Sequence, residues 1–307
     1  MGTTSRQLWG IDLGGTKIEG AILESPDSSK TLFRDRLPTE THKGYEHVLN
    51  QISRVVDMMK AAAGYTPGRI GIGTPGTMDP ATGLFKNSNS AVLNFKPLQA
   101  DLQKLIGIEV VSANDANCFA LAETRLGVVR QNFPDAKVVF GVIMGTGAGG
   151  GVVVEGKVIQ GKQGIAGEWG HNFLDESGGK CYCGKIGCVE NIIAGPALEK
   201  FYREKSGSEK KLKEIVGLAK SGTDPIAVET IDRLHKMFGK AISVVINILD
   251  PDVIVIGGGV GNIDSLYTKG VEQIKDYVFN DRLDTPVVRP ALGDSAGVFG
   301  AAFLVEK

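Results

Sequence analysis

The feature that most constrains the fold is a strand, glycine turn, strand pattern that occurs twice in the 307-residue chain. Residues 8–23 and residues 138–154 each hold an apolar run, a turn rich in glycine and a second apolar run. Each pair is followed by segments that alternate between helical and strand patterns, which is typical of α/β domains. The sequence therefore predicts two related α/β domains, with a hinge between about Asn114 and Lys137.

Several helices and strands follow from the spacing of apolar residues. Tyr45–Ala63 repeats them with the period of an amphipathic helix, and Ile231–Leu249 carries a second such face. Further helices are predicted at residues 98–106, 116–126 and 295–305, and further strands at residues 31–37, 69–72, 109–112 and 253–256.

Charge and composition exclude some classes of partner. Lys and Arg number 34 against 35 Asp and Glu, so no basic excess exists to bind nucleic acid or an anionic membrane. The segment 1–6 has no apolar region of a secretion signal, and the uncharged run 138–154 is too short and too broken to cross a bilayer. With no extended disulfide framework either, a cytoplasmic protein is expected.

The first glycine turn has the composition of a phosphate-binding turn. It places Asp12 at a strand end, Gly14 and Gly15 in the turn, and then Thr16 and Lys17. Backbone amides of such a turn can approach a polyphosphate because no Cβ obstructs them, and Asp12 could orient Mg²⁺ through water. An ordinary β-hairpin is the alternative for this turn taken alone.

A second turn and a glycine triplet strengthen the phosphate interpretation. Gly145, Thr146 and Gly147 occupy the matching place in the second half of the chain. Two such turns facing each other would bind a triphosphate from both sides. At the end of a later strand, Gly257, Gly258 and Gly259 offer flat space for a purine or ribose, although a tight packing turn would look the same.

One histidine and three cysteines lie within eighteen residues. His171, Cys181, Cys183 and Cys188 supply one imidazole and three thiolates, which is the full ligand set of a structural Zn²⁺ site. Because no coordination position stays open, the metal is expected to hold the loop rather than to activate water. Reduced surface thiols beside an unrelated histidine are the alternative.

Acidic residues near this loop and near the hinge are candidates for substrate chemistry. Glu168 and Glu190 flank the zinc loop, and carboxylates can accept hydrogen bonds from a polyhydroxylated ligand. Asn114 and Asp115 stand at a strand end before a helix. Asp115 is either a helix N-cap or the general base for a hydroxyl that attacks a phosphoryl group.

Together these motifs resemble the ROK family of bacterial sugar kinases and repressors. The resemblance covers essentially the whole chain and is carried by four segments: Asp12-Leu13-Gly14-Gly15-Thr16, Asn114-Asp115-Ala116-Asn117, Glu168-Trp169-Gly170-His171 and Cys181-Tyr182-Cys183-Gly184-Lys185-Ile186-Gly187-Cys188-Val189-Glu190. It implies an α/β, actin-like (ribonuclease H-like) duplicated two-domain ATPase fold with a central cleft. It also implies transfer of phosphate from MgATP to the 6-hydroxyl of a hexose.

The resemblance also implies roles for single residues. Asp115 resembles the catalytic base, and His171 serves both sugar and zinc. The residues that resemble sugar contacts are Gly76, Asn89, Asn114, Asp115, Glu168, His171 and Glu190. The domains are expected at residues 1–115, joined by a C-terminal helix at about 295–307, and at residues 116–294, with the zinc loop at 171–188. A homodimer is expected because dimers are common in the family.

Within the family, the sequence most resembles the manno(fructo)kinase type of bacterial fructokinase. Residues 83–90, 167–172, 181–185, 247–259 and 293–302 carry that likeness. Fructose is therefore the expected substrate, with mannose as a second. N-acetylglucosamine kinases and glucokinases share many of these motifs and remain the alternatives.

Two alternatives come from other classes of protein. A sugar-sensing repressor of this family needs an N-terminal helix-turn-helix domain, and only 11 residues precede Asp12 here. A non-catalytic sugar-binding protein would not need Asp115 together with both glycine turns. An ATP-dependent sugar kinase is therefore the predicted function.

Overall fold

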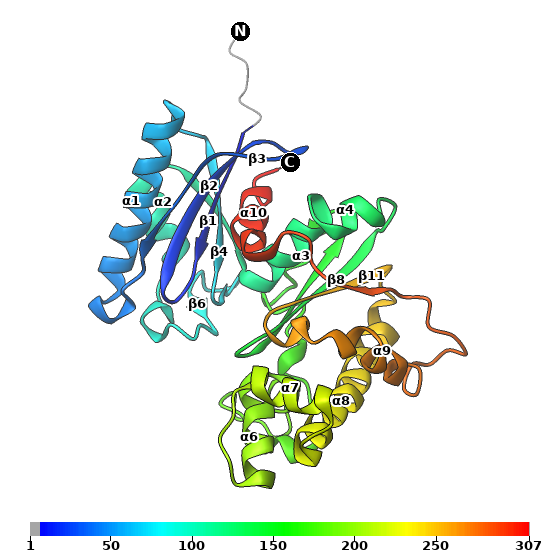
Figure 1. The fold of residues 1–307 in the computed structure, drawn as a ribbon. Helices are drawn as coiled ribbons and strands as arrows, with labels where there is room; N and C mark the ends of the chain where they lie inside the picture. The colour runs from blue at the N-terminus through cyan, green and yellow to red at the C-terminus, as the bar shows by residue number, and fades with distance from the viewer. Residues whose placement is uncertain (1–6, 307) are drawn as a thin grey trace. The chain divides into compact units, whose positions relative to one another are not determined.

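Two five-stranded sheets form the framework of the protein, whose computed structural model describes residues 7–306 (Figure 1). These residues divide into two compact units, one made of residues 7–134, 151–166 and 291–306, the other of residues 135–150 and 167–290. The prediction about a secretion signal concerns segment 1–6, which lies outside the described residues. The domain boundary expected at Asp115 stays a prediction, because compactness alone does not show where an independently folding domain ends.

The first sheet combines an antiparallel hairpin with parallel strands. Its order is β3-β2-β1-β4-β7. The hairpin strands and β3 pair antiparallel, whereas β4 and β7 run parallel to β1. The bounds are β1 Leu8–Leu13, β2 Lys17–Ser25, β3 Ser28–Pro38, β4 Arg69–Thr74 and β7 Glu109–Asn114. The first glycine turn joins β1 to β2, as the strand, glycine turn, strand pattern predicted.

Helices cover both faces of this sheet (Figure 1). Helix α1 (Tyr45–Ala63) has the predicted bounds, and its apolar face is buried in one core with strands β1 and β2. It ends at Gly64, whose φ of 74° is in the left-handed region that ends many helices. Helix α2 (Leu98–Ile106) was also predicted with these bounds.

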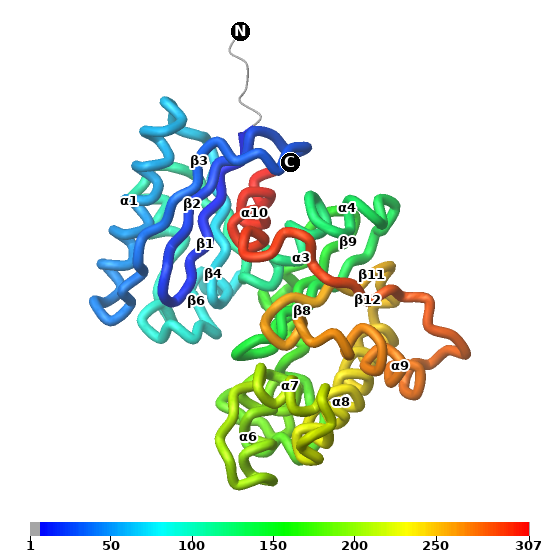
Figure 2. The backbone as a smooth tube through the Cα atoms, viewed as in Figure 1, coloured from blue at the N-terminus to red at the C-terminus, as the bar shows by residue number. Residues whose placement is uncertain are grey.

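The C-terminal helix α10 (Ala296–Phe303) packs beside β1 and β4, as the red and blue segments of Figure 2 show. Small residues permit this close approach. A Cβ on Gly71 would lie 1.7 Å from the Ala301 carbonyl oxygen, and one on Gly10 would lie 2.4 Å from that of Val298. Helix α10 also packs against α3 (Asp115–Arg125). A side chain at either glycine would therefore push the helix off the sheet.

The second sheet repeats the plan of the first. Its order is β10-β9-β8-β11-β12, in which a hairpin pair is extended by an antiparallel strand on one side and by parallel strands on the other. The bounds are β8 Val138–Met144, β9 Ala148–Val154, β10 Lys157–Val158, β11 Val253–Gly257 and β12 Val287–Val288. The division between the two units falls within β9. The predicted duplication is confirmed by this matching order of strands.

The helices of the second unit include two that the sequence analysis missed. These are α6 (Gly195–Ser206) and α7 (Leu212–Ser221). The long helix α8 (Pro225–Leu249) begins six residues before the predicted start, because the Asp224 carboxylate caps it by accepting from the amides of Ile226 and Ala227. The shorter helices of the second unit are α5 Glu190–Ile193 and α9 Lys269–Ile274. The shorter elements of the first unit are α4 Val128–Asn132, β5 Thr77–Met78 and β6 Phe85–Lys86.

Within residues 7–306, no helix combines the length and the apolar character needed to span a bilayer.

Candidate functional site

The first glycine turn joins β1 to β2 and is closed by the protein's own hydrogen bonds. The amide of Gly14 donates to the Lys17 carbonyl at 2.9 Å, and the Thr39 hydroxyl donates to the Gly14 carbonyl at 2.7 Å. A Cβ on Gly15 would meet nothing closer than the Ser90 hydroxyl at 3.7 Å. The φ of Gly15 lies outside the left-handed region, so the glycine leaves space here rather than supplying an unusual backbone angle.

Lys17, predicted to contact phosphate, takes part in an ion pair. Its ammonium lies 2.9 Å from the carboxylate of Glu19, which Arg34 also binds. Although burial raises the pKa of Glu19, the hydrogen bonds from the two cations outweigh burial and hold that pKa below its usual value. To bind a phosphate directly, the Lys17 ammonium would therefore have to leave Glu19. If it stays with Glu19, its positive charge could still attract a phosphate at longer range.

Two carboxylates of the first unit lie near each other, one on β1 and one at the start of α3. Burial, followed by the charge of Asp115, raises the pKa of Asp12 to about 6. The side chain of Asp115 remains open to solvent, yet protein atoms crowd around it and this desolvation raises its pKa. A divalent cation would stabilise the ionised forms of both carboxylates. This arrangement fits the predicted role of Asp12 toward Mg²⁺.

The structure decides which residue caps α3. The side chain of Asn114 accepts from the Asn117 amide at 2.8 Å, which makes Asn114 the N-cap. The carboxylate of Asp115 instead accepts from the amide of the adjacent Ala116, at 2.7 Å. The alternative in which Asp115 is the N-cap is therefore wrong, and its carboxylate is available to a ligand.

One glycine that the sequence analysis did not select makes room for Asp12. A Cβ on Gly297, at the start of α10, would lie 2.8 Å from its carboxylate, whereas a Cβ on Gly73 of β4 would first meet the Cys118 sulfur, at 3.1 Å. Gly297 stands in the segment 293–302 that carried part of the family resemblance. The close approach to a buried acid, which no sequence spacing shows, gives the physical reason for a small residue there.

Two predicted sugar contacts lie on loops of the first unit, Gly76 between β4 and β5 and Asn89 after β6. Gly76 packs tightly, because a Cβ there would lie 2.6 Å from the Lys86 carbonyl oxygen. The loop after β6 is held by Asn94, which bonds the backbone of Ser88 through both its amide oxygen and its amide nitrogen. Asn89 is exposed. The roles of Gly76 and Asn89 toward a sugar stay predictions.

The second glycine turn, between β8 and β9, donates a hydrogen bond to a side chain that is distant in the sequence. The Gly145 amide donates to the Gly147 carbonyl at 2.9 Å, and the Ala148 amide donates to the Glu190 carboxylate at 2.9 Å. At the end of β11, Gly258 needs glycine because its φ is 85° and a Cβ would lie 2.3 Å from the Met144 carbonyl oxygen. Gly259 instead has nothing within 4 Å of a Cβ, which leaves open space.

The four predicted zinc ligands come together. Their donor atoms all lie within 4.8 Å of one another, with 3.7 Å between Nδ1 of His171 and the sulfur of Cys181, and 3.6 Å between the sulfurs of Cys183 and Cys188. Ligand atoms around a tetrahedral zinc are about 3.5–3.8 Å apart, because Zn–S bonds measure about 2.3 Å. One imidazole and three thiols at these distances fit a structural zinc ion.

The predicted sugar-binding residues of the second unit gather around Tyr182. Its hydroxyl lies 3.0 Å from Nε2 of His171, the ring nitrogen opposite the cluster of thiols. Burial, followed by the negative charges around it, raises the pKa of Tyr182 to about 12, and both Glu190 and Glu168 are among those charges. Tyr182 was not selected from the sequence, although it lies within the cysteine motif.

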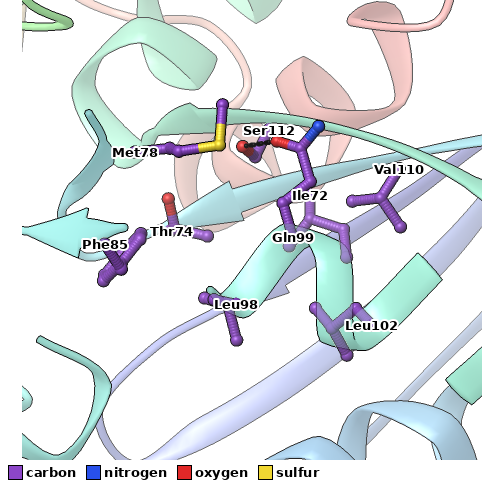
Figure 3. A pocket seen from close by; sticks show the side chains of 9 residues that line it. All are labelled: Ile72, Thr74, Met78, Phe85, Leu98, Gln99, Leu102, Val110 and Ser112. Atoms are coloured by element: carbon purple, nitrogen blue, oxygen red, sulfur yellow. Dashed lines mark hydrogen bonds between the residues drawn. The ribbon is translucent and has the colours of Figure 1, made fainter. Parts of the chain in front are cut away.

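A small cavity in the first unit is not a substrate site. Its volume is about 10 Å³, which holds about one water molecule. Figure 3 shows the cavity beside α2, with the Ser112 hydroxyl bonded to the side chain of Gln99 at 2.8 Å. The other lining residues are Ile72, Thr74, Met78, Phe85, Leu98, Leu102 and Val110, all but one of them apolar.

Solved structures of other proteins share this fold. A ROK hexokinase from Thermus thermophilus matches with a TM-score of 0.86 and 32% identity, over 97% of each chain. A ROK family glucokinase from Streptomyces griseus, in complex with glucose and AMPPNP, matches with a TM-score of 0.76 and 27% identity, over 97% of this chain and 98% of that one. The protein thus has the actin-like, two-domain α/β fold that the sequence predicted.

Sequence comparison narrows the class further. The model of the ROK family matches residues 8–307. An N-acetyl-D-glucosamine kinase from Haemophilus influenzae (strain 86-028NP) is 36% identical over 307 residues, which cover 96% of this chain and 98% of that protein. The chain belongs to the ROK family.

Proposed function

We propose that this protein is an ATP-dependent hexose kinase that phosphorylates the 6-hydroxyl of N-acetylglucosamine. The observation that carries the proposal is the match, over nearly the full length of both chains, to relatives named N-acetyl-D-glucosamine kinases. The carboxylate of Asp115, left free by the Asn114 cap and open to solvent, supports a catalytic role.

The choice of sugar differs from the sequence expectation. The motifs between residues 83 and 302 favoured fructose, whereas the relatives with 34–36% identity carry the name N-acetyl-D-glucosamine kinase. The similarity to these relatives extends over 96–97% of this chain, whereas the motifs cover only a few short segments. N-acetylglucosamine therefore becomes the proposed substrate, and fructose with mannose becomes the alternative.

Asp115 is proposed to accept the proton of the attacking hydroxyl. Phosphoryl transfer depends mainly on in-line placement and on neutralising charge, and the proton leaves late, so an ionised carboxylate is a sufficient base. The raised pKa of Asp115 makes it a better proton acceptor than an ordinary aspartate. Its carboxylate must be ionised to act, and a bound divalent cation beside Asp12 favours that form.

The remaining site residues are proposed to bind and orient the substrates. The amides of Gly15 and Thr16 in the first turn and those of Thr146 and Gly147 in the second would donate to nucleotide phosphates, and open space at Gly259 would take the nucleoside. Sugar hydroxyls would donate hydrogen bonds to the carboxylates of Glu168 and Glu190. They would also form hydrogen bonds with the imidazole of His171. Bound magnesium would neutralise phosphate charge, and Asp12 would hold it through water.

Zinc is proposed to be structural. His171, Cys181, Cys183 and Cys188 would use every tetrahedral position, so the ion would fix the loop that presents Tyr182 and Glu190. The homodimer expected from the family resemblance stays a prediction.

The test is ADP release from MgATP with single sugars: N-acetylglucosamine, N-acetylmannosamine, glucose, mannose and fructose. Turnover led by N-acetylglucosamine supports the proposal. Turnover led by fructose keeps the kinase and overturns the substrate. If the folded, zinc-loaded protein binds a sugar but turns over none, a non-catalytic sugar-binding protein takes its place.

A further inference from the structure

The carboxylate of Glu190 lies on the backbone of the second glycine turn. Its Oε2 atom accepts from the Ala148 amide at 2.9 Å, across 42 residues of chain. Glu190 begins α5, two residues after the zinc-ligand candidate Cys188. An ionised carboxylate that accepts from a backbone amide makes a stronger hydrogen bond than a neutral acceptor does. The bond therefore ties the zinc loop directly to the turn.

The glycine at position 147 is explained by this carboxylate. A Cβ on Gly147 would lie 2.5 Å from Oε2 of Glu190, whereas its φ is not in the left-handed region. The Glu190 carboxylate, and not the backbone angle, thus accounts for the lack of room for a side chain at position 147. An alanine at 147 would displace the flexible end of Glu190 from the Ala148 amide.

Other bonds hold the same turn from the same segment of chain. The indole nitrogen of Trp169 donates to the Gly149 carbonyl at 2.8 Å, and the Gly195 amide donates to the Gly145 carbonyl at 2.9 Å. Among the turn's own amides, those of Gly145 and Ala148 donate within the protein, and those of Thr146 and Gly147 have no acceptor among the described residues. These hydrogen bonds hold the turn and leave the amides of Thr146 and Gly147 to donate to a ligand.

We propose that Glu190 is a positioning residue for the nucleotide: its Oε2 atom fixes the turn so that the amides of Thr146 and Gly147 are held ready for phosphate oxygens. The inference rests on the proposed kinase function and deepens it. It is compatible with a sugar contact, because Oε1 of Glu190 makes no hydrogen bond within residues 7–306. One carboxylate would then serve the sugar with one oxygen and the phosphate turn with the other.

The experiment uses the full zinc-loaded chain and four variants: Glu190→Ala, Glu190→Gln, Gly147→Ala, and the double variant Glu190→Ala/Gly147→Ala. Binding of MgAMPPNP is measured without sugar by calorimetry, together with zinc content and with hydrogen exchange of the peptide that spans residues 145–150. Glu176→Ala is the matched control, because Glu176 is an exposed glutamate of the same loop.

Glu190→Ala and Gly147→Ala are each expected to raise the Kd of MgAMPPNP about tenfold and to speed exchange of the 145–150 peptide by a similar factor. The double variant is expected to match either single variant, because both remove the same bond. Glu190→Gln keeps an oxygen acceptor for the Ala148 amide and is expected to stay within about threefold of the wild-type Kd. All variants should retain zinc.

Three results would contradict the inference. Unchanged MgAMPPNP affinity in Glu190→Ala would mean that the residue acts on the sugar alone. Additive losses in the double variant would mean that Glu190 and Gly147 act separately. Equal losses in Glu176→Ala would indicate a general effect on the loop. If the wild-type protein binds no nucleotide, the proposed function fails instead, and the exchange data alone then decide whether Glu190 holds the turn.

Discussion

The two glycine turns each join a pair of strands, but the space that their glycines leave is used differently. At Gly15 of the first turn, the nearest atom to a Cβ would be 3.7 Å away, so the space is open to a ligand. At Gly147 of the second turn, the Glu190 carboxylate of the same chain occupies the space. Duplicated turns can therefore keep one residue type for two different physical reasons, and the predictions below test that difference.

Asp115→Asn, next to the first turn's Asp12, is expected to have the largest effect. An amide cannot accept the hydroxyl proton, so kcat should fall about 10³-fold, while the KM values for sugar and nucleotide change by less than about threefold. Steady-state kinetics with both substrates varied measures this split. Turnover close to that of the wild type would contradict the role of Asp115 as the base.

Cys183→Ser tests whether the second turn alone depends on the zinc loop. Loss of one thiolate should lower zinc affinity by about 100-fold or more, measured as metal content after dialysis against a chelator. Hydrogen exchange should speed up at residues 145–150 and stay unchanged at residues 13–17. Equal changes in both turns, or full retention of zinc, would remove the proposed difference between them.

Asp12→Asn tests how much the buried carboxylate beside the first turn lowers the free energy of unfolding. The pKa of Asp12 is 3.8 in the unfolded chain and about 6 in the folded protein. The free energy of unfolding therefore falls as the pH rises through this range, because the unfolded chain loses the proton more readily. The variant should therefore be more stable than the wild type at pH 7.5, by at most about 3 kcal/mol, and equally stable near pH 3.5. Urea unfolding at both pH values measures the difference.

The same variant should weaken binding of magnesium nucleotide, because the carboxylate is lost. A constant difference in stability at all pH values would show that Asp12 is not strained by burial and by Asp115.

Gly15→Ala should have the smallest effect on the fold. The structure has room for the methyl group, so the free energy of unfolding should change by less than about 0.5 kcal/mol. The KM for MgATP should nevertheless rise about tenfold, because the new Cβ enters the space where a phosphate would approach. An unchanged KM would show that the first turn does not meet the nucleotide.

Much of the fold could be predicted because local patterns agree with it. Helix α1 was placed to the residue, since its apolar period runs between two glycines that interrupt helices, Gly44 and Gly64. Helices α6 and α7 were not predicted, and they bury few large side chains: Leu198 and Tyr202 in α6, and Ile215 in α7. Pro196 and Gly207 mark the two ends of α6 and could have revealed it.

The candidate site was harder to predict in detail than the fold. Asn114 and Asp115 are both good N-caps, so only the observed bond from the Asn117 amide to Asn114 decides between them. The bond between Glu190 and Ala148 joins residues 42 positions apart, and no spacing rule reports such a contact. Gly297 acquires its meaning only from the position of the Asp12 carboxylate, and Gly73 from that of the Cys118 sulfur.

The most direct test of the account is a competition between N-acetylglucosamine and fructose at equal concentration in one vessel with limiting MgATP. The ratio of the two phosphorylated products, measured by mass spectrometry, equals the ratio of the kcat/KM values. The account predicts that N-acetylglucosamine phosphate exceeds fructose phosphate at least about tenfold, which corresponds to about 1.4 kcal/mol of discrimination. An excess of fructose phosphate would contradict the proposed substrate, and the absence of both products would contradict the kinase.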